Sequence, residues 1–317
     1  MWAYMARRIL WTIPIVLGIV LITFLLFGLI AKDPARAYAG KIASPAQLDA
    51  LRHRMGLDKP KWINTAGPGS VFDSQFFDVL LFRFPNSLRY DEPMWSLFAR
   101  KAPVSAAIQI PVFLIELGLQ LLLALVVAYN RGRWPDYLVT LLAVLGMSVP
   151  GLSIYLAAQW FFGGYLGIFP VAGWDVWPYW MSFAALPILV SVLGGLGGGT
   201  RFYRTVILEE INADYVRTAK AKGVPQNEVM FTHVLRNVMI PVVTNTIVAL
   251  PGLLVGALLL ERLFQIPGFG GLLVDAIGNQ DFVVVMAVVY VTSIAYCLAL
   301  LLTDLCYMLV DPRIVLR

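Results

Sequence analysis

The sequence has 317 residues, of which 59% are hydrophobic and only 14% are charged, and its formal net charge is +5. This composition lies outside the usual range of soluble domains and predicts a membrane protein. Long apolar runs separate the basic residues, which argues against a nucleic-acid-binding face. The two histidines lie in polar stretches, and Cys297 and Cys306 would fall on opposite faces of one helix, so no metal site is expected.

The first apolar run extends from Ile9 to Ala31, directly after Arg7 and Arg8. A helix needs roughly 20 apolar residues to cross the hydrocarbon core, so this run predicts a spanning helix. The alternative is a cleaved signal peptide, because residues 37–39 (Ala-Tyr-Ala) resemble a cleavage site. The run is longer than the usual ~7–15 residues of a signal core, which favours the spanning helix.

Residues 32–103 mix charged residues, proline, glycine and aromatics, and they predict a small ordered cap outside the membrane. A helix start is expected at Ser44, with Pro45 in the first helical position and Gln47 completing a capping box. This helix would run to about Met55 and end before Gly56.

Five further apolar segments predict spanning helices, which makes six in all. They cover residues 104–129, 137–162, 178–198, 239–260 and 283–310. Lys and Arg gather in the short loops on the side of the N-terminus, so the positive-inside rule predicts that both termini are cytoplasmic. The expected class is an all-α membrane protein with six transmembrane helices and an extracytoplasmic insertion after the first.

The loop between the fourth and fifth spans, residues 200–238, contains the pattern of a helix, a break and a second helix. Acidic residues gather in the first turn and basic residues in the last turn of the first helix, which suits the helix dipole. Gly223 can take a positive φ at its end, and Pro225 suits the start of the next helix. Such a corner is suited to docking a cytoplasmic partner; the alternative is a solvated connector.

Gly223, followed eighteen residues later by Pro241, resembles the cytoplasmic signature of type I ABC-importer permeases. Residues 214–223 (DYVRTAKAKG) and 233–241 (HVLRNVMIP) resemble the dipeptide/oligopeptide/nickel transport branch, in particular its first, B-type permease. So do residues 267–277 and the terminal 311–314 (DPRI). In this chain Arg217-Thr218-Ala219 stands at the Glu-Ala-Ala positions of the general signature, a form typical of the peptide branch.

This resemblance implies a non-catalytic permease subunit that forms half of the pathway for peptides delivered by an extracytoplasmic binding protein. It also implies a second homologous permease, and two cytoplasmic ATPase subunits that bind ATP and Mg while this chain binds no cofactor. The location would be the bacterial inner membrane. Nickel, glutathione or another small solute are alternative cargoes, and a secondary transporter is a distant alternative. The implied divisions are an N-terminal helix (1–31), an extracytoplasmic segment (32–103), a five-helix core (104–310) and a cytoplasmic tail (311–317).

The resemblance places ATPase coupling at the corner of the cytoplasmic loop. A glycine-rich segment at 194–200 is the one phosphate-loop lookalike, but it lacks the lysine before Thr200 and begins inside a span, so close helix packing or a bend is the preferred interpretation. The residues expected in coupling are Tyr215, Arg217, Thr218, Ala219, Lys222, Gly223, Val224 and Pro225.

Polar residues within the spans predict a pathway or a helix contact. One stripe in the second span comprises Ser105, Gln109, Glu116 and Gln120, and another in the sixth comprises Thr292, Tyr296, Thr303 and Tyr307. Such residues face protein or water, either as a pathway or as contacts between helices. Glu261, beside Arg262, is expected at the membrane interface. The pathway candidates are Gln109, Glu116, Gln120 and Tyr296.

Overall fold

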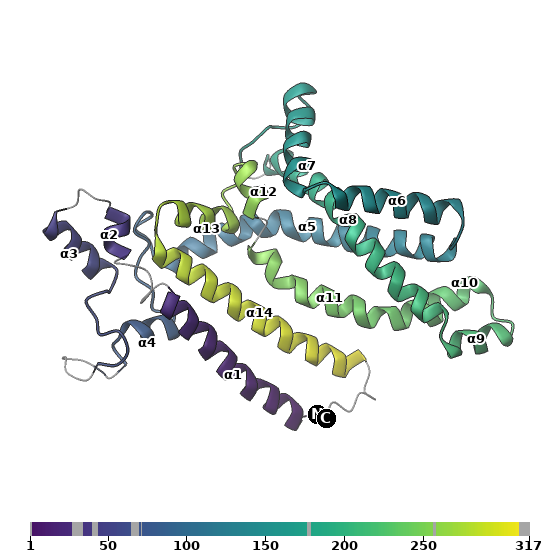
Figure 1. The fold of residues 1–317 in the computed structure, drawn as a ribbon, viewed down its shortest axis with the longest axis horizontal. Coiled ribbons are helices and arrows are strands. Elements are labelled where there is room, and N and C mark those ends of the chain that lie inside the picture. Colours follow the sequence, from purple (N-terminus) through teal and green to yellow (C-terminus); the bar gives the residue numbers. More distant parts are fainter. Residues whose placement is uncertain are drawn as a thin grey trace.

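The computed structural model describes residues 2–26, 34–39, 44–64, 70, 72–175, 179–255 and 258–310. Every regular element in these ranges is a helix (Figure 1). Five helices are each long and apolar enough to cross a membrane, and a bent pair supplies a sixth span. The expected all-α class with six transmembrane helices is confirmed. The terminal motif at 311–314 lies outside the described residues.

The spans are longer than the apolar runs that predict them. Helix α5 starts at Met94 rather than at Val104, and α8 continues to Ile211, well beyond Gly198. With 36 and 32 residues, these helices are roughly 54 and 48 Å long, whereas the hydrocarbon core is about 30 Å thick. Each is therefore longer than the hydrocarbon core that it crosses. The spans are α1 (Trp2–Phe24), α5 (Met94–Tyr129), α6 (Trp134–Ser148) with α7 (Gly151–Ala158), α8 (Trp180–Ile211), α11 (Leu235–Val255) and α14 (Phe282–Val310).

The third span is bent, where the sequence predicts one continuous helix. The segments Trp134–Ser148 and Gly151–Tyr165 meet at 92°. Val149 has extended backbone angles (φ −95°, ψ 126°) and is followed by Pro150. Proline disfavours the helical conformation of the residue before it and donates no backbone hydrogen bond, so the helix breaks here. The last part of this span is the π-helix η2 (Gln159–Tyr165).

The segment predicted to be extracytoplasmic contains α2 (Pro34–Ala39), α3 (Pro45–Arg54) and α4 (Gln75–Leu80), which gather at one end of the molecule (Figure 1). The helix start predicted at Ser44 is confirmed. Its side chain accepts from the Gln47 amide at 3.3 Å, and the Gln47 side chain accepts from the Ser44 amide at 2.9 Å. Gly56 follows with φ +68°, as expected of a residue that ends a helix.

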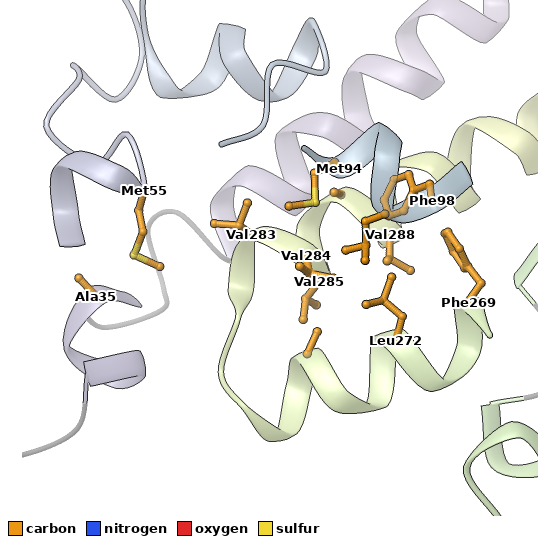
Figure 2. Packing of buried hydrophobic residues seen from close by; sticks show 13 residues of the cluster. Ala35, Met55, Met94, Phe98, Phe269, Leu272, Val283, Val284, Val285 and Val288 are labelled. Atoms are coloured by element: carbon orange, nitrogen blue, oxygen red, sulfur yellow. The ribbon is translucent and has the colours of Figure 1, made fainter. Parts of the chain in front are cut away.

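This cap is attached to the membrane helices by an apolar cluster and a buried acid. Figure 2 shows Met55 and Ala35 from the cap with Val283 from the start of α14, in a cluster that also includes residues of α5 and of α13 (Phe269–Gly278). Asp281 is 1% exposed and accepts from Ser87 Oγ at 2.9 Å and from the Leu88 amide at 3.1 Å. The cap is therefore packed on the ends of the spans.

The loop predicted to be cytoplasmic forms the opposite end of the molecule. It contains α9 (Asp214–Ala221), the short α10 (Gln226–Glu228) and the π-helix η3 (Val229–Val234), far from α2, α3 and α4 in Figure 1. Helix α1 ends near α4, and α14 begins beside the cap, so the N-terminal end of α1 and the C-terminal end of α14 point toward the other end. This arrangement fits the predicted orientation.

Candidate coupling corner and polar pathway

Helix α9 has one buried and one exposed face. Val216 and Ala219, three residues apart, are 0% and 8% exposed and pack with Tyr203 and Ile207 of α8 and with Val234 of η3. Because residues i and i+3 lie on one side of a helix, burial of these two turns the charged side chains outward. Ala219 therefore positions the helix, and its side chain does not form part of the exposed surface.

The corner after α9 is closed by a pair of backbone hydrogen bonds. The Val224 amide donates to the Ala219 carbonyl at 3.2 Å, and the Gly223 amide donates to the Lys220 carbonyl at 3.0 Å. Gly223 has φ +79°. These are the bonds of a Schellman motif, in which the residue after the helix adopts the left-handed conformation that glycine favours. Pro225 is the N-cap residue of α10, so this helix begins one residue after the proline, whereas the sequence predicts that it begins at the proline.

The residues predicted to couple separate into three groups by exposure. Tyr215 and Val224 are half-buried, and Ala219 is buried. The exposed group surrounds the glycine, and a Cβ added at Gly223 would have no atom within 4 Å. The corner is thus an open, basic surface on a backbone that two hydrogen bonds close. Its exposed members are Arg217, Thr218, Lys222, Gly223 and Pro225.

Tyr215 ties the start of α9 to the end of α8. Its hydroxyl donates to Glu210 Oε2 at 2.6 Å. Burial raises the pKa of Tyr215, and the neighbouring Glu210 carboxylate raises it further, so the phenol stays protonated and remains a donor. The contact fixes the direction in which α9 leaves the bundle.

The polar stripe of α5 packs on glycines of α8. Gln120 Nε2 donates to the Gly195 carbonyl at 3.1 Å. A Cβ at Gly195 would collide with the Glu116 carboxylate, and one at Gly199 would collide with the Gln120 side chain. Small residues let helices approach closely. The interpretation of the glycine-rich segment as a packing element is confirmed.

The pathway candidates have different environments. Gln109 and Glu116 are half-buried, and the Glu116 carboxylate accepts no hydrogen bond within the described part of the chain. Tyr296 on α14 is 46% exposed. Gln120 of α5 contacts α8 within this chain. The pathway role of the four candidates stays a prediction. The side chain of Tyr307 lies outside the described residues.

Comparison with known families gives a direct assignment. Residues 120–316 match the family described as "Binding-protein-dependent transport system inner membrane component". Residues 1–67 match the N-terminal component of the same transport systems. The chain belongs to this permease family. It is therefore a membrane component of a transport system, in agreement with the predicted recognition.

Relatives match this permease over almost their whole length. A putative peptide transport system permease protein of Brucella suis biovar 1 is 31% identical over 99% of each chain. A dipeptide transport system permease protein of Lactococcus lactis is 31% identical, with 95% of this chain and 96% of the relative covered. A glutathione transport system permease protein of Salmonella paratyphi A is 32% identical over 98% of each chain.

The permease also contains a buried polar cluster that the sequence does not predict. Glu261 of α12 (Leu258–Leu263) is 1% exposed, so its side chain is enclosed by the protein, while its position at the membrane interface stays a prediction. Its carboxylate accepts from Ser105 Oγ at 2.6 Å and from the Gly271 amide at 2.8 Å. Ser105 Oγ in turn accepts from the Phe269 amide at 2.7 Å. Two free amides at the start of α13 are thus satisfied by a serine and an acid.

This cluster explains the Pro-Gly-Phe-Gly-Gly motif at 267–271. A Cβ at Gly268 would collide with the Glu261 carboxylate and with Ser105 Oγ. At Gly271 a Cβ would lie 3.2 Å from the Ile266 carbonyl. The motif has glycine at these two positions because the Glu261 carboxylate and the Ser105 hydroxyl lie directly against the start of α13, which leaves no room for a side chain. The spacing of the glycines is the only sequence signal, since Ser105 lies 156 residues before Glu261.

Proposed function

We propose that this permease forms half of the translocation pathway of an ATP-driven importer of short peptides in the bacterial inner membrane. The observation that carries the proposal is the exposed Schellman corner at Gly223, at the end of the molecule opposite the cap. A rigid, open corner of this kind in a binding-protein-dependent permease is suited to contact a cytoplasmic ATPase. Both termini would lie in the cytoplasm.

The proposed assembly contains a second homologous permease, two ATPase subunits and an extracytoplasmic binding protein. ATP and Mg²⁺ would be bound by the ATPases, and this chain would be non-catalytic. The exposed group around Gly223, with Tyr215 and Val224 behind it, would transmit the motion of the ATPases. Ala219 would contribute by holding α9 on the bundle.

For the pathway itself, we propose Gln109, Glu116, Gln120 and Tyr296. Glu116 is the main candidate because an ionisable group within a span is costly unless it faces protein or water. Its carboxylate has no hydrogen-bond donor in the described part of this chain, so a partner subunit or water in the pathway would provide one.

The peptide substrate is supported by the names of relatives, which include peptide and dipeptide transport permeases. The second candidate is glutathione, favoured by the 32% identity with the Salmonella relative. Nickel permeases belong to the same branch, but none of the relatives described above is a nickel permease.

The test is to purify the chain from native membranes under mild detergent, identify the proteins that accompany it, and reconstitute the complex in vesicles. A second permease and ATPases should accompany it, and uptake of radiolabelled dipeptide should require ATP. Excess unlabelled glutathione should compete poorly. Transport by the chain alone without ATP would contradict the proposal.

A further inference from the structure

A polar hollow of about 520 Å³ lies at the cap end of the permease, where α5, α12 and α13 meet. This size falls within the roughly 300–1,000 Å³ typical of small-molecule sites. Its wall includes Lys101 from α5, Glu261 and Arg262 from α12, Asp275 from α13 and the connecting residues 265–268. Polar groups of three separate helices therefore face one space.

The two acids in this wall already have donors within the chain. Both Glu261 oxygens accept hydrogen bonds, one from Ser105 and one from the Gly271 amide. Asp275 accepts from Arg262 at 2.8 Å. Their oxygens are therefore engaged by groups of the permease itself.

Lys101 is different. It is half-buried, and within the described residues it forms no hydrogen bond and no ion pair. Its Nζ lies 6.0 Å from the centroid of the Tyr90 ring. The carboxylates of Asp275, Glu261 and Glu92 attract the ammonium from beyond ion-pair distance. Arg100, its neighbour in sequence, is paired with Glu92 instead. A partly desolvated ammonium whose N–H donors have no acceptor in the described chain favours an anion that can accept from them, and a carboxylate is the common small anion of organic solutes.

The hollow also lies in line with the candidate pathway. Lys101, Ser105 and Gln109 are spaced four residues apart on α5. Together with Glu116 and Gln120 they lie within an arc of about 100° around the helix axis. The lysine is therefore the extracytoplasmic end of the polar stripe.

We propose that this hollow is a binding subsite for the carboxylate of a small solute, with Lys101 as the group that binds it. The inference rests on the proposed function, because it treats the solute as cargo that enters along α5. It adds a recognition chemistry at the pathway entrance: a free carboxylate, which the C-terminus of a short peptide supplies.

The test measures protection of a reporter cysteine in the assembled transporter. Pro267 and Gln265 line the hollow and are exposed, so Pro267→Cys is the reporter and Gln265→Cys is a second one. Both are placed in a background with Cys297→Ala and Cys306→Ala. The rate of labelling by a small maleimide is measured with dialanine, N-acetyl-dialanine or dialanine amide, without ATP and without binding protein.

Dialanine and N-acetyl-dialanine should slow the labelling, whereas the amide should not. Lys101→Gln should raise the half-protecting concentration of dialanine by about tenfold to a hundredfold, because a charge-assisted hydrogen bond is lost. Lys101→Arg, which keeps the charge, should change it little. Equal protection by the amide, or no protection at either reporter, would overturn the proposal.

The outcome is independent of the transport assay. ATP-dependent dipeptide uptake without protection would leave the proposed function standing and reject the subsite. Protection without any dipeptide uptake would keep the carboxylate subsite and reject peptides as the cargo.

Discussion

Ser105 Oγ donates to Glu261 Oε1 at 2.6 Å and accepts from the Phe269 amide, so one hydroxyl joins α5 to both α12 and α13. The three groups are buried together. This contact fixes the helix pair that lies at the cap end of the permease, beside the hollow described above.

Replacing Ser105 by Ala should destabilise the permease. The change leaves the Phe269 amide without an acceptor and removes one donor to Glu261, at a cost of about 1–3 kcal/mol. The midpoint of thermal unfolding in detergent should fall. Ser96→Ala is the control, since Ser96 lies on the same helix but is exposed. An equal effect of the two changes would contradict the role of Ser105.

Gly268→Ala should have a comparable or larger effect. The new methyl group would collide with Glu261 and Ser105, so the start of α13 must move. Gly278→Ala, near the other end of α13, meets no atom within 4 Å and is the matched control. The yield of folded protein by size-exclusion chromatography should fall for the first variant alone; a normal yield of Gly268→Ala would refute the explanation of the motif.

Gly197→Ala tests the packing of α8 on α6. A Cβ at Gly197 would lie 2.7 Å from the Ala143 carbonyl oxygen, a backbone atom that cannot rotate away. Overpacking of this kind costs about 1–3 kcal/mol. The adjacent Gly198 has open space, so Gly198→Ala should be neutral or slightly stabilising. Thermal unfolding of the two variants side by side decides the matter, and identical midpoints would count against close packing.

Asp281→Ala should loosen the cap. Asp281 accepts from Ser87 and Leu88 and from the Val284 amide in the first turn of α14. Losing it leaves several buried donors unsatisfied, so residues 72–93 should become more sensitive to protease added from the extracytoplasmic side. Asp281→Asn keeps one acceptor oxygen and should show a smaller change. Unchanged digestion of the Ala variant would argue that the apolar cluster alone holds the cap.

Local patterns in the sequence predict the elements whose partners are close along the chain. The capping box at Ser44 and Gln47 and the break at Gly223 are of this kind, because each depends on residues three to five positions away. The lengths of the apolar runs likewise predict the number of spans. They misplace the start of α5, because its first turns contain polar and charged residues and are not part of an apolar run.

The remaining features depend on contacts between distant residues. The burial of Glu261 has no local signal because its partner Ser105 is 156 positions away. Asp281 is equally undistinguished in sequence until Ser87 is brought beside it. The bend at Val149 does have a local signal in Pro150, but prolines at 103 and 111 lie inside α5 without ending it. Whether a proline breaks its helix therefore depends on how the neighbouring helices pack against it.

The most direct test of the account compares Gly223→Asp with Gly223→Asn in the reconstituted transporter. Both residues tolerate a positive φ, and the corner has open space, so both variants should insert and fold. They differ in charge, and a carboxylate buried against a docked ATPase is costly. ATP-dependent peptide uptake per assembled permease should fall at least about tenfold for Asp, equivalent to roughly 1.4 kcal/mol, and much less for Asn. Unimpaired uptake by the Asp variant would contradict the claim that this corner couples the permease to its ATPase.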